Sequence, residues 1–352
     1  MMPNDRPSPN RVRQFRQRLG WSQARLAAAA GVSRAAVSAI EICRLVPSVA
    51  AALALARVLD CTVEDLFGNG ENEPAAETWA WAPKDPCRFW RARVGHRVLR
   101  FPVEATVAGL LPHDGVFQDG VAEIVRDCCP EKTLVLASCD PAAGLLASEY
   151  EGASGFRLLP VHRSSRASLE LLGQGVVHAA GIHLATTDDD AANARAARTM
   201  LGDGFALLRF ASWDEGLAVQ PGLSARSVNA LVRGKLRWIG REAGAGARQC
   251  QDEILGQRPA PRRLARDHWG VAEAVRCGWA DVGVCLRLVS EQAGLSFLHV
   301  RDEAYDLCFP ESFSADVRLK KLLELLRSPS LRRLFAALPG YELSRTLESR
   351  SL

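Results

Sequence analysis

The chain has 352 residues, of which 48% are hydrophobic, and carries a formal net charge of +4 at pH 7. It is long enough for two or three domains with separate cores. No apolar run approaches the roughly 20 residues that a membrane-spanning helix needs, and the arginine-rich start lacks the apolar core of a secretion signal. We therefore expect a cytoplasmic protein whose ten cysteines are free thiols, metal ligands or redox groups.

Positive charge is concentrated near the N-terminus. Residues 10–67 contain eight arginines and four acidic residues, and their net charge equals the excess of the whole chain. The rest of the chain is therefore neutral overall. A basic module on a neutral body predicts a nucleic-acid-binding part joined to a part with a different role.

Residues 21–41 predict two short helices joined by a tight turn. Ser22 can cap the first helix, and Gly31 supplies the positive φ that such a turn needs. Ser33 can cap the second helix, in which Val37 and Ile40 point inward at i, i+3 spacing. This is the plan of a helix-turn-helix.

The outward face of the second helix is the candidate DNA-reading surface. The inward spacing turns Arg34, Ala35 and Ser38 outward together, toward a DNA major groove. An amphipathic helix before residue 20, another over residues 53–59 and a short last turn at residues 61–68 extend the pattern to five small helices.

Residues 10–68 resemble the Cro/repressor-type (XRE) DNA-binding domain through RQFRQRLGWSQARLAAAAGVSRAAVSAIE, Pro47-Ser48 and VEDLFG. The resemblance implies an all-α helix-turn-helix domain that binds double-stranded operator DNA, with Gln23 as a phosphate contact. We expect a homodimer, because one module reads only a half-site. Where the family has a glycine after the glutamate that ends the recognition helix, this chain has Ile42-Cys43, so the turn there is expected to differ. The assigned DNA-binding residues are Gln23, Ser33, Arg34, Ala35 and Ser38.

Residues 69–119 predict a linker followed by a small β-rich connector. The run NGENEPAAE at residues 69–77 is polar and has no apolar period. The following segment is rich in aromatic residues, which we interpret as packing groups, and residues 98–107 predict one or two strands.

Residues 120–345 predict a parallel α/β fold. The apolar runs KTLVLAS, FRLLPVH and VVHAAGIH alternate with helical segments, and a second set of such units follows. Ser314 and Ser328 are the candidate caps of two C-terminal helices.

This region resembles the periplasmic-binding-protein-like (type 2) effector domain, related to molybdate-type receptors, that is fused to bacterial DNA-binding domains. The resemblance rests on residues 138–140 (SCD) and on the runs GQGVVHAAGIHL, IGREAGAGARQCQDEIL, HWGVAEAVRCGWADVGV and EAYDLCFP. It implies two α/β lobes that close on a ligand. We place lobe one at residues 120–209 and 303–345, and lobe two at residues 210–302.

The candidate ligand site lies where strands end and helices begin. Hydroxyls, arginines and backbone N–H groups near two glycines predict a cradle for a small anion: an oxyanion such as molybdate or tungstate, or a small carboxylate or phosphate compound. Asp140 fits only if it orients an arginine or accepts from a hydroxylated or protonated ligand. The candidate ligand-binding residues are Ser138, Cys139, Asp140, Ser164, Ser165, Arg166, His183, Arg241, Gly244, Gly246, Arg248, His268, Glu303 and Tyr305.

Cysteines form an alternative constellation. Cys139, Cys250, Cys285 and Cys308 all fall in or beside stretches assigned to the cleft or hinge, and the resemblance predicts histidine at position 139. Thiolates near arginines suit a thiol-based redox sensor or a soft-metal sensor, although no metal site is assigned. No GxSxG, Walker or HExxH motif is found, so we expect no enzyme and no cofactor beyond the effector. The sequence thus predicts a ligand-responsive transcriptional regulator.

Overall fold

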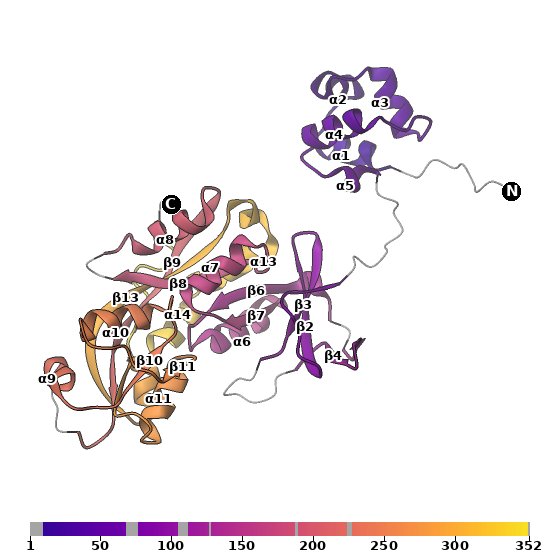
Figure 1. The fold of residues 1–352 in the computed structure, drawn as a ribbon. Helices are drawn as coiled ribbons and strands as arrows, with labels where there is room; N and C mark the ends of the chain where they lie inside the picture. The colour runs from indigo at the N-terminus through magenta and orange to yellow at the C-terminus, as the bar shows by residue number, and fades with distance from the viewer. Residues whose placement is uncertain are drawn as a thin grey trace. The chain divides into compact units, whose positions relative to one another are not determined.

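The fold is that of a computed structural model, which describes residues 10–67, 77–104, 112–126, 128–186, 189–223 and 227–350. The chain divides into two compact units, residues 1–76 and 77–352 (Figure 1). The expected linker lies outside the described residues, apart from Glu77. No described helix is both long and apolar enough to cross a membrane.

The described part of the N-terminal unit is built from short helices, and its cap residues are those that the sequence predicts. The Ser22 hydroxyl accepts a hydrogen bond from the Arg25 N–H, and the Ser33 hydroxyl accepts one from the Ala36 N–H. Ser48 caps a helix that begins at Val49, four residues earlier than the apolar period indicated. The helices are α1 (Val12–Arg18), α2 (Gln23–Ala30), α3 (Arg34–Glu41), α4 (Val49–Val58) and α5 (Val63–Phe67).

The end of the recognition helix α3 differs from the family pattern in a specific way. The Cys43 N–H donates to the Ile40 carbonyl at 2.9 Å, and the Arg44 N–H donates to the Ala39 carbonyl at 2.8 Å. These two bonds form a Schellman motif, whose C′ residue adopts a left-handed conformation and is usually glycine. Here that residue is Cys43, with φ of 57°. The turn therefore keeps a regular geometry and places a non-glycine residue at its left-handed position.

The second unit begins with a five-stranded sheet in the order β1-β3-β2-β4-β5. Trp90, Leu99 and Phe101 of this sheet share one hydrophobic core with Val135 and Leu159 of the following α/β region. The sheet is thus part of the α/β body, and the boundary expected at residue 119 falls in the turn between β4 and β5. The strands are β1 (Thr78–Trp79), β2 (Cys87–Val94), β3 (Arg97–Pro102), β4 (Gly115–Gln118) and β5 (Val121–Ile124).

A buried ion pair connects this sheet to lobe one. Both carboxylate oxygens of Asp114, which is fully buried, accept from the Arg157 guanidinium at 2.6 and 2.7 Å. Oδ2 of Asp114 also accepts from the Arg91 N–H in β2 at 2.7 Å. One carboxylate therefore joins the β2 backbone to Arg157, the first residue of β7 (Arg157–His162).

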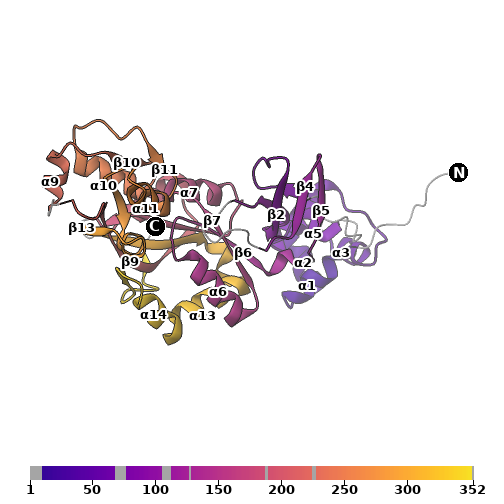
Figure 2. The same cartoon turned by 90° about the horizontal axis from the view of Figure 1, so that it is seen from below.

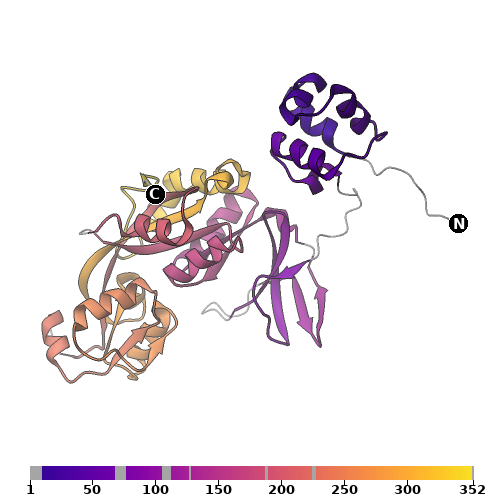
Figure 3. The ribbon, with the colours of Figure 1, turned by 45° about the horizontal axis from the view of Figure 1, so that its top comes forward.

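The α/β region contains a ten-stranded sheet that runs through two lobes, with the main order β11-β10-β12-β9-β13-β8-β6-β7. Strands within each lobe are parallel, whereas the two long strands β9 (Phe205–Val219) and β13 (Ser296–Pro310) are antiparallel and pair over most of their length. These two strands pass between the lobes (Figure 3). The other strands of this path are β6 (Thr133–Ser138), β8 (Ala179–Thr186), β10 (Trp238–Arg241), β11 (Leu264–Ala265) and β12 (Val282–Leu286).

Helices cover both faces of each lobe, as the alternating sequence pattern predicts. In lobe one, α6 and α13 contact each other on one face of the sheet (Figure 2), and α7 and α8 also contact each other. The expected Ser328 cap is confirmed, but α13 is capped by Asp316, because Ser314 lies in a preceding 3₁₀ turn. The helices are α6 (Ala143–Ser154), α7 (Ser165–Gly173), α8 (Ala192–Leu201), α9 (Val228–Arg233), α10 (Gly246–Leu255), α11 (His268–Arg276), α12 (Arg287–Gln292), α13 (Val317–Arg327) and α14 (Pro329–Ala336).

The C-terminal segment returns to the hinge. Its short strands β14 (Tyr341–Glu342) and β15 (Ser349–Arg350) both pair with β9. Tyr341 lies opposite Trp213 in this pairing, and the two rings are in edge contact at 5.7 Å. The last described residues thus reinforce the strand that joins the lobes.

Candidate functional site

The exposed face of α3 carries the predicted DNA-reading residues. Arg34 and Ala35 are exposed and Ser38 is half-buried, whereas Val37 and Ile40 are buried in the core of the unit. The side chain of Ser33 is occupied by its capping bond. The i, i+3 spacing therefore separates a core face from a polar face, as expected for a recognition helix.

Gln23, the predicted phosphate contact, is held by the end of α3. Its Nε2 donates to the Glu41 carboxylate at 2.8 Å, and the same carboxylate receives two hydrogen bonds from Arg16. Burial opposes the charge of Glu41, but the bonds from Arg16 and Gln23 lower the pKa of this carboxyl group below its ordinary value. This network joins α1, α2 and α3 and fixes the side chain of Gln23 at the start of α2.

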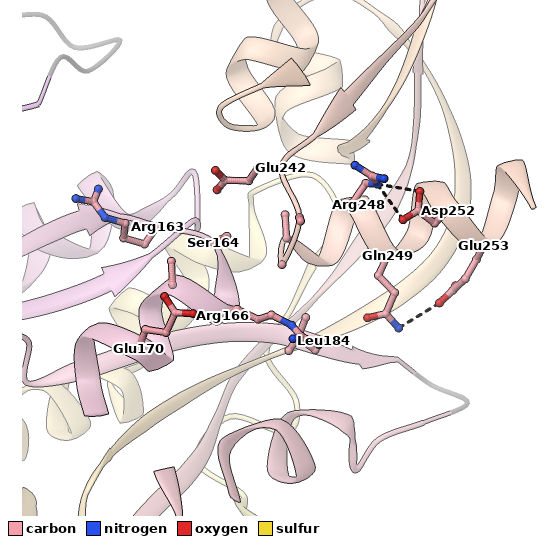
Figure 4. A pocket seen from close by; sticks show the side chains of 14 residues that line it. Arg163, Ser164, Arg166, Glu170, Leu184, Glu242, Arg248, Gln249, Asp252 and Glu253 are labelled. Carbon is pink, nitrogen blue, oxygen red and sulfur yellow. Dashed lines mark hydrogen bonds and ion pairs between the residues drawn. The ribbon is translucent and has the colours of Figure 1, made fainter. Parts of the chain in front are cut away.

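A pocket of about 880 Å³ lies between α7 of lobe one and the loop before α10 of lobe two (Figure 4). Four candidate residues line it: Ser164, Arg166, Gly244 and Arg248. Its walls also carry acidic side chains, and Arg248 is paired with Asp252 at 2.8 Å. This outer pocket has mixed charge and is not by itself an anion cradle.

Deeper between the lobes lies a set of buried polar atoms without hydrogen-bond partners. They are Oδ2 of Asp140, Nε2 of His162, both ring nitrogens of His268, and Nε and Nη1 of Arg241. Asp140 follows β6, His162 ends β7, Arg241 ends β10 and His268 begins α11. The four residues thus lie where strands end or helices begin in both lobes, and we call them the cleft-base cluster.

The cleft-base cluster contains one cationic side chain, Arg241, and three titratable side chains whose pKa values are shifted by burial. Burial lowers the pKa of His268 well below its usual range, and the charges of Arg241 and His183 lower it further. Burial, opposed by Asp267, lowers the pKa of His162 to about 4. Burial raises the pKa of Asp140 to about 6, even though Tyr341 donates a hydrogen bond to it. Near neutral pH His162 and His268 are therefore neutral, Asp140 is mostly ionised, and the guanidinium of Arg241 is the strongest donor of the cluster.

A second network adjoins this cluster. Sγ of Cys139 lies 2.8 Å from Nε2 of His183, and Nδ1 of His183 lies 2.7 Å from Oε2 of Glu303. The main-chain N–H of His183 donates to the Ser165 hydroxyl at 3.1 Å. Ser138 and Tyr305 share a hydrogen bond at 2.6 Å, and the Tyr305 ring stacks on Trp213.

Charged residues of the hinge strands support this second network. Arg301 of β13 binds Glu303 on the same strand at 2.6 Å and Glu215 on β9 at 3.0 Å. Burial opposes the charge of Glu303, but His183 and Arg301 lower its pKa to about 2. Burial and the nearby charge of Glu303 raise the pKa of Glu215 well above its usual range. Glu303 is therefore the charged member of this carboxyl pair.

The lobes touch closely at two glycines. A Cβ added to Gly246 would lie 2.3 Å from the main-chain oxygen of His183, and one added to Gly244 would lie 3.2 Å from the Arg166 side chain. The Arg166 N–H also points to the Gly244 carbonyl at 3.4 Å. The glycines of the GAGAR run thus permit the approach of lobe two to lobe one, a role that the sequence reading did not assign to them.

Comparison with known families identifies both units. A family model described as the PBP superfamily domain matches residues 147–327. The chain belongs to the PBP superfamily. A helix-turn-helix family model matches residues 12–66, and the N-terminal unit is a helix-turn-helix of the XRE type, as the sequence predicts. The chain thus combines a DNA-binding domain with a ligand-binding domain of the PBP superfamily.

Two proteins of Bacillus subtilis (strain 168) show similarity in sequence. The uncharacterized protein YvgK is 28% identical over 219 residues, which cover 59% of this chain and 70% of YvgK. The uncharacterized HTH-type transcriptional regulator YgzD is 40% identical over 58 residues, which cover 16% of this chain and 88% of YgzD.

Solved structures of similar fold include transport receptors. One is a phosphate ABC transporter substrate-binding protein from Clostridium perfringens, with a TM-score of 0.49 and 10% identity, covering 60% of this PBP-superfamily protein and 99% of that chain. Another is the tungstate ABC transporter from Geobacter sulfurreducens, with a TM-score of 0.44 and 12% identity, covering 56% of this chain and 95% of that one.

The structure does not bring the four cysteines of the alternative reading together. Cys250, Cys285 and Cys308 belong to three different hydrophobic clusters, and of the four cysteines only Cys139 contacts the side chain of a cleft histidine. Among the described residues, the one group that could hold a metal is Asp214, His299 and Asp302, which contains no cysteine. A shared soft-metal site therefore has no geometric support in the described part of the chain.

Several residues of the cleft were missed by sequence reasoning. His162 follows the same rule that selected Ser138, since both end a parallel strand, so a uniform use of that rule would have found it. Arg301 and Glu215 could not be selected by that rule, because they lie inside long strands and meet only through strand pairing. Tyr341 reaches Asp140 across 201 positions of sequence.

Proposed function

We propose that this protein is a ligand-responsive transcriptional regulator whose effector is a small anion bound at the cleft-base cluster. The observation that carries the proposal is Arg241, which is 2% exposed and leaves Nε and Nη1 without acceptors. Each unpaired buried donor costs about 1–3 kcal/mol, and more for a charged group. An anion between the lobes supplies the missing acceptors.

The geometry of the cluster supports a ligand that touches both lobes. Arg241 and His268 belong to lobe two, whereas Asp140 and His162 belong to lobe one. An anion that accepts from Arg241 and His268 and also contacts Asp140 or His162 stabilises the closed arrangement. The raised pKa of Asp140 lets it donate to an oxygen of the ligand when protonated, or accept from a hydroxyl group of the ligand.

Thermal-shift and calorimetric titrations of the full chain test the anion proposal. The probes are molybdate, tungstate, phosphate, sulfate and small carboxylates, and at least one should raise the melting temperature. Arg241→Gln should weaken its binding by about tenfold or more, since a charged hydrogen bond is worth about 1.5–3 kcal/mol. The control Arg237→Gln changes an exposed arginine of the same lobe, paired with Asp281, and should bind normally. Equal binding by both variants contradicts the proposal.

The DNA-binding output is assigned to the exposed face of α3. Arg34, Ala35 and Ser38 would read base edges, and Gln23, fixed by Glu41, would contact a phosphate. Two such domains in a homodimer would match two half-sites about one helical turn apart. Ligand binding would change operator affinity only through a difference in affinity between the two states of the dimer.

Operator binding by variants tests this assignment. Arg34→Ala should weaken specific binding by about tenfold or more and relax the sequence preference, since a bidentate base contact is worth about 1–3 kcal/mol. Arg57→Ala, an exposed arginine of α4, should have a smaller effect that is equal across sequences. Specific binding that Arg34→Ala leaves intact would exclude Arg34 as a base reader.

A further inference from the structure

Cys139 differs from the other buried cysteines in its surroundings. Its Sγ lies 2.8 Å from His183, and the Cys139, His183 and Glu303 side chains are all at most 2% exposed. By contrast, the Cys285 thiol donates to the main-chain carbonyl of His268 at 3.4 Å, and burial raises the pKa of this thiol to about 12. Burial likewise raises the pKa of Cys308 to about 12. These two thiols are packing groups.

The contacts of His183 with Glu303 and Cys139 define which of its ring nitrogens carries a hydrogen. Glu303 is ionised and can only accept, so Nδ1 of His183 carries a hydrogen directed at Oε2. Nε2 of His183 and Sγ of Cys139 then share one proton. A nucleophile beside a base whose other nitrogen is oriented by a carboxylate is the arrangement that activates a thiol. Burial opposes the imidazolium form, but Cys139 and Glu303 raise the pKa of His183 well above its usual range.

The cleft-base cluster contributes unpartnered buried donors near this thiol. Asp140 is the next residue after Cys139, and the His268 ring lies 6.3 Å from the His183 ring. The unpartnered nitrogens of Arg241 and His268 belong to side chains that are at most 2% exposed. A ligand bound to these donors would therefore lie near His183, the residue that contacts the sulfur. It can carry an electrophilic atom next to its anionic group.

We propose that Cys139 is a nucleophilic thiol of the effector cleft that adds reversibly to the carbonyl carbon of a small carboxylate, such as a 2-oxo acid or an aldehyde acid. This inference rests on the proposed anion site and names the class of its effector. Arg241 binds the carboxylate, and the thiolate attacks the adjacent carbonyl carbon.

The step is balanced without an oxidant or a second reactant. The S–C bond forms while the carbonyl π bond breaks, and the carbonyl oxygen takes the proton from Nε2 of His183 to become a hydroxyl group. The product is a hemithioacetal or hemithioketal, and the reverse step returns the proton to His183. The ligand is then bonded to lobe one through Cys139 and ion-paired to lobe two through Arg241, which holds the lobes closed.

Charge-selective alkylation of the full chain tests the thiol. Iodoacetate is an anionic electrophile and iodoacetamide is its neutral counterpart; both form an S–C bond and release iodide. Peptide mapping by mass spectrometry reports on Cys139 separately from the other cysteines. Iodoacetate should label Cys139 at least about tenfold faster than iodoacetamide does, because its carboxylate can pair with Arg241. Arg241→Gln should remove the preference, His183→Gln should slow both reagents, and Arg237→Gln should change neither rate.

Carbonyl chemistry is tested with [2-¹³C]glyoxylate and with oxalate, which has no aldehyde. Glyoxylate should give a protein-bound tetrahedral carbon signal that Cys139→Ser abolishes, while oxalate binding measured by calorimetry persists in that variant. If oxalate or another anion binds in an Arg241-dependent way but Cys139 shows no iodoacetate preference and no glyoxylate adduct, the thiol inference is wrong and the anion proposal stands. If no anion binds and Arg241→Gln has no effect, both are wrong.

Discussion

Tyr341 in the C-terminal segment donates a hydrogen bond from its hydroxyl to Oδ1 of Asp140 in the cleft, at 2.5 Å. Oδ2 of the same carboxyl group has no partner. One oxygen of Asp140 is therefore fixed by the segment that pairs with the hinge strand β9, and the other is one of the unpartnered atoms of the cleft-base cluster. Because β14 pairs with β9, this bond connects the hinge, the C-terminal segment and the candidate ligand site.

Asp140 should make stability depend on pH between about 4 and 6. Burial raises its folded pKa to about 6, whereas an unfolded aspartate titrates near 3.9. The stabilisation that protonated Asp140 gives the folded state is fully present below the unfolded pKa. It is lost as the pH rises through 6, which lowers the free energy of unfolding by about 2–3 kcal/mol. His162 and His268, whose pKa values are lowered, contribute in the opposite direction. Urea unfolding of wild type and Asp140→Asn should be measured from pH 4 to pH 7. As the pH rises, the free energy of unfolding of the variant should increase relative to that of wild type. A constant gap contradicts this assignment.

The ion pair of Asp114 and Arg157 should be essential for attaching the first sheet to lobe one. Asp114→Ala leaves a mostly buried guanidinium without its counter-charge, and the cost of breaking a buried pair is about 3–5 kcal/mol. Denaturant unfolding of the full chain measures the loss. The control Asp189→Ala breaks an exposed pair with Arg195 and should leave the unfolding midpoint unchanged. Equal midpoints for both variants would show that the buried pair does not stabilise this attachment.

Gly246→Ala should impair closure of the lobes. The new Cβ would lie 2.3 Å from the His183 carbonyl oxygen, so α10 has to move away from lobe one. We expect affinity for the anion that binds wild type to fall by about tenfold or more, as calorimetry would measure. Gly144→Ala is the matched control, because a Cβ at this position in α6 meets nothing within 4 Å. Unchanged affinity in Gly246→Ala would mean that the ligand binds without this contact.

Cys43→Gly should stabilise the helix-turn-helix unit. A Cβ in the left-handed conformation costs about 1–2 kcal/mol, and glycine removes that cost at the C′ position of α3. Cys43→Ala keeps the Cβ and removes only the thiol, which lies 3.3 Å from Nδ2 of Asn10. The glycine variant should unfold at a higher temperature than the alanine variant. The reverse order would mean that the left-handed turn carries no strain.

Local sequence signals were sufficient for the N-terminal unit and for the alternation of strands and helices. Ser22, Ser33 and Gly31 act within one turn of their own positions, so propensity and capping alone predict the helix-turn-helix. Residues at strand ends, such as Ser138 and Arg241, could likewise be selected as cleft candidates, because parallel strands place their carboxyl ends on one edge. The Ser314 cap was wrong, since Asp316 two residues later offers the same capping chemistry.

Only the tertiary structure decided which candidates meet. Cys139 and His183 are separated by 44 positions, and His183 and Glu303 by 120. Their contacts depend on the register of β8, β13 and β9, which no local pattern specifies. The sequence by itself determined the two kinds of domain and the edge of the sheet at which the candidate ligand site lies. Only the packing of the lobes distinguishes the outer pocket of mixed charge from the buried, unpaired polar groups of the cleft-base cluster. The reason is that the burial and pairing of a side chain depend on residues that are distant in sequence.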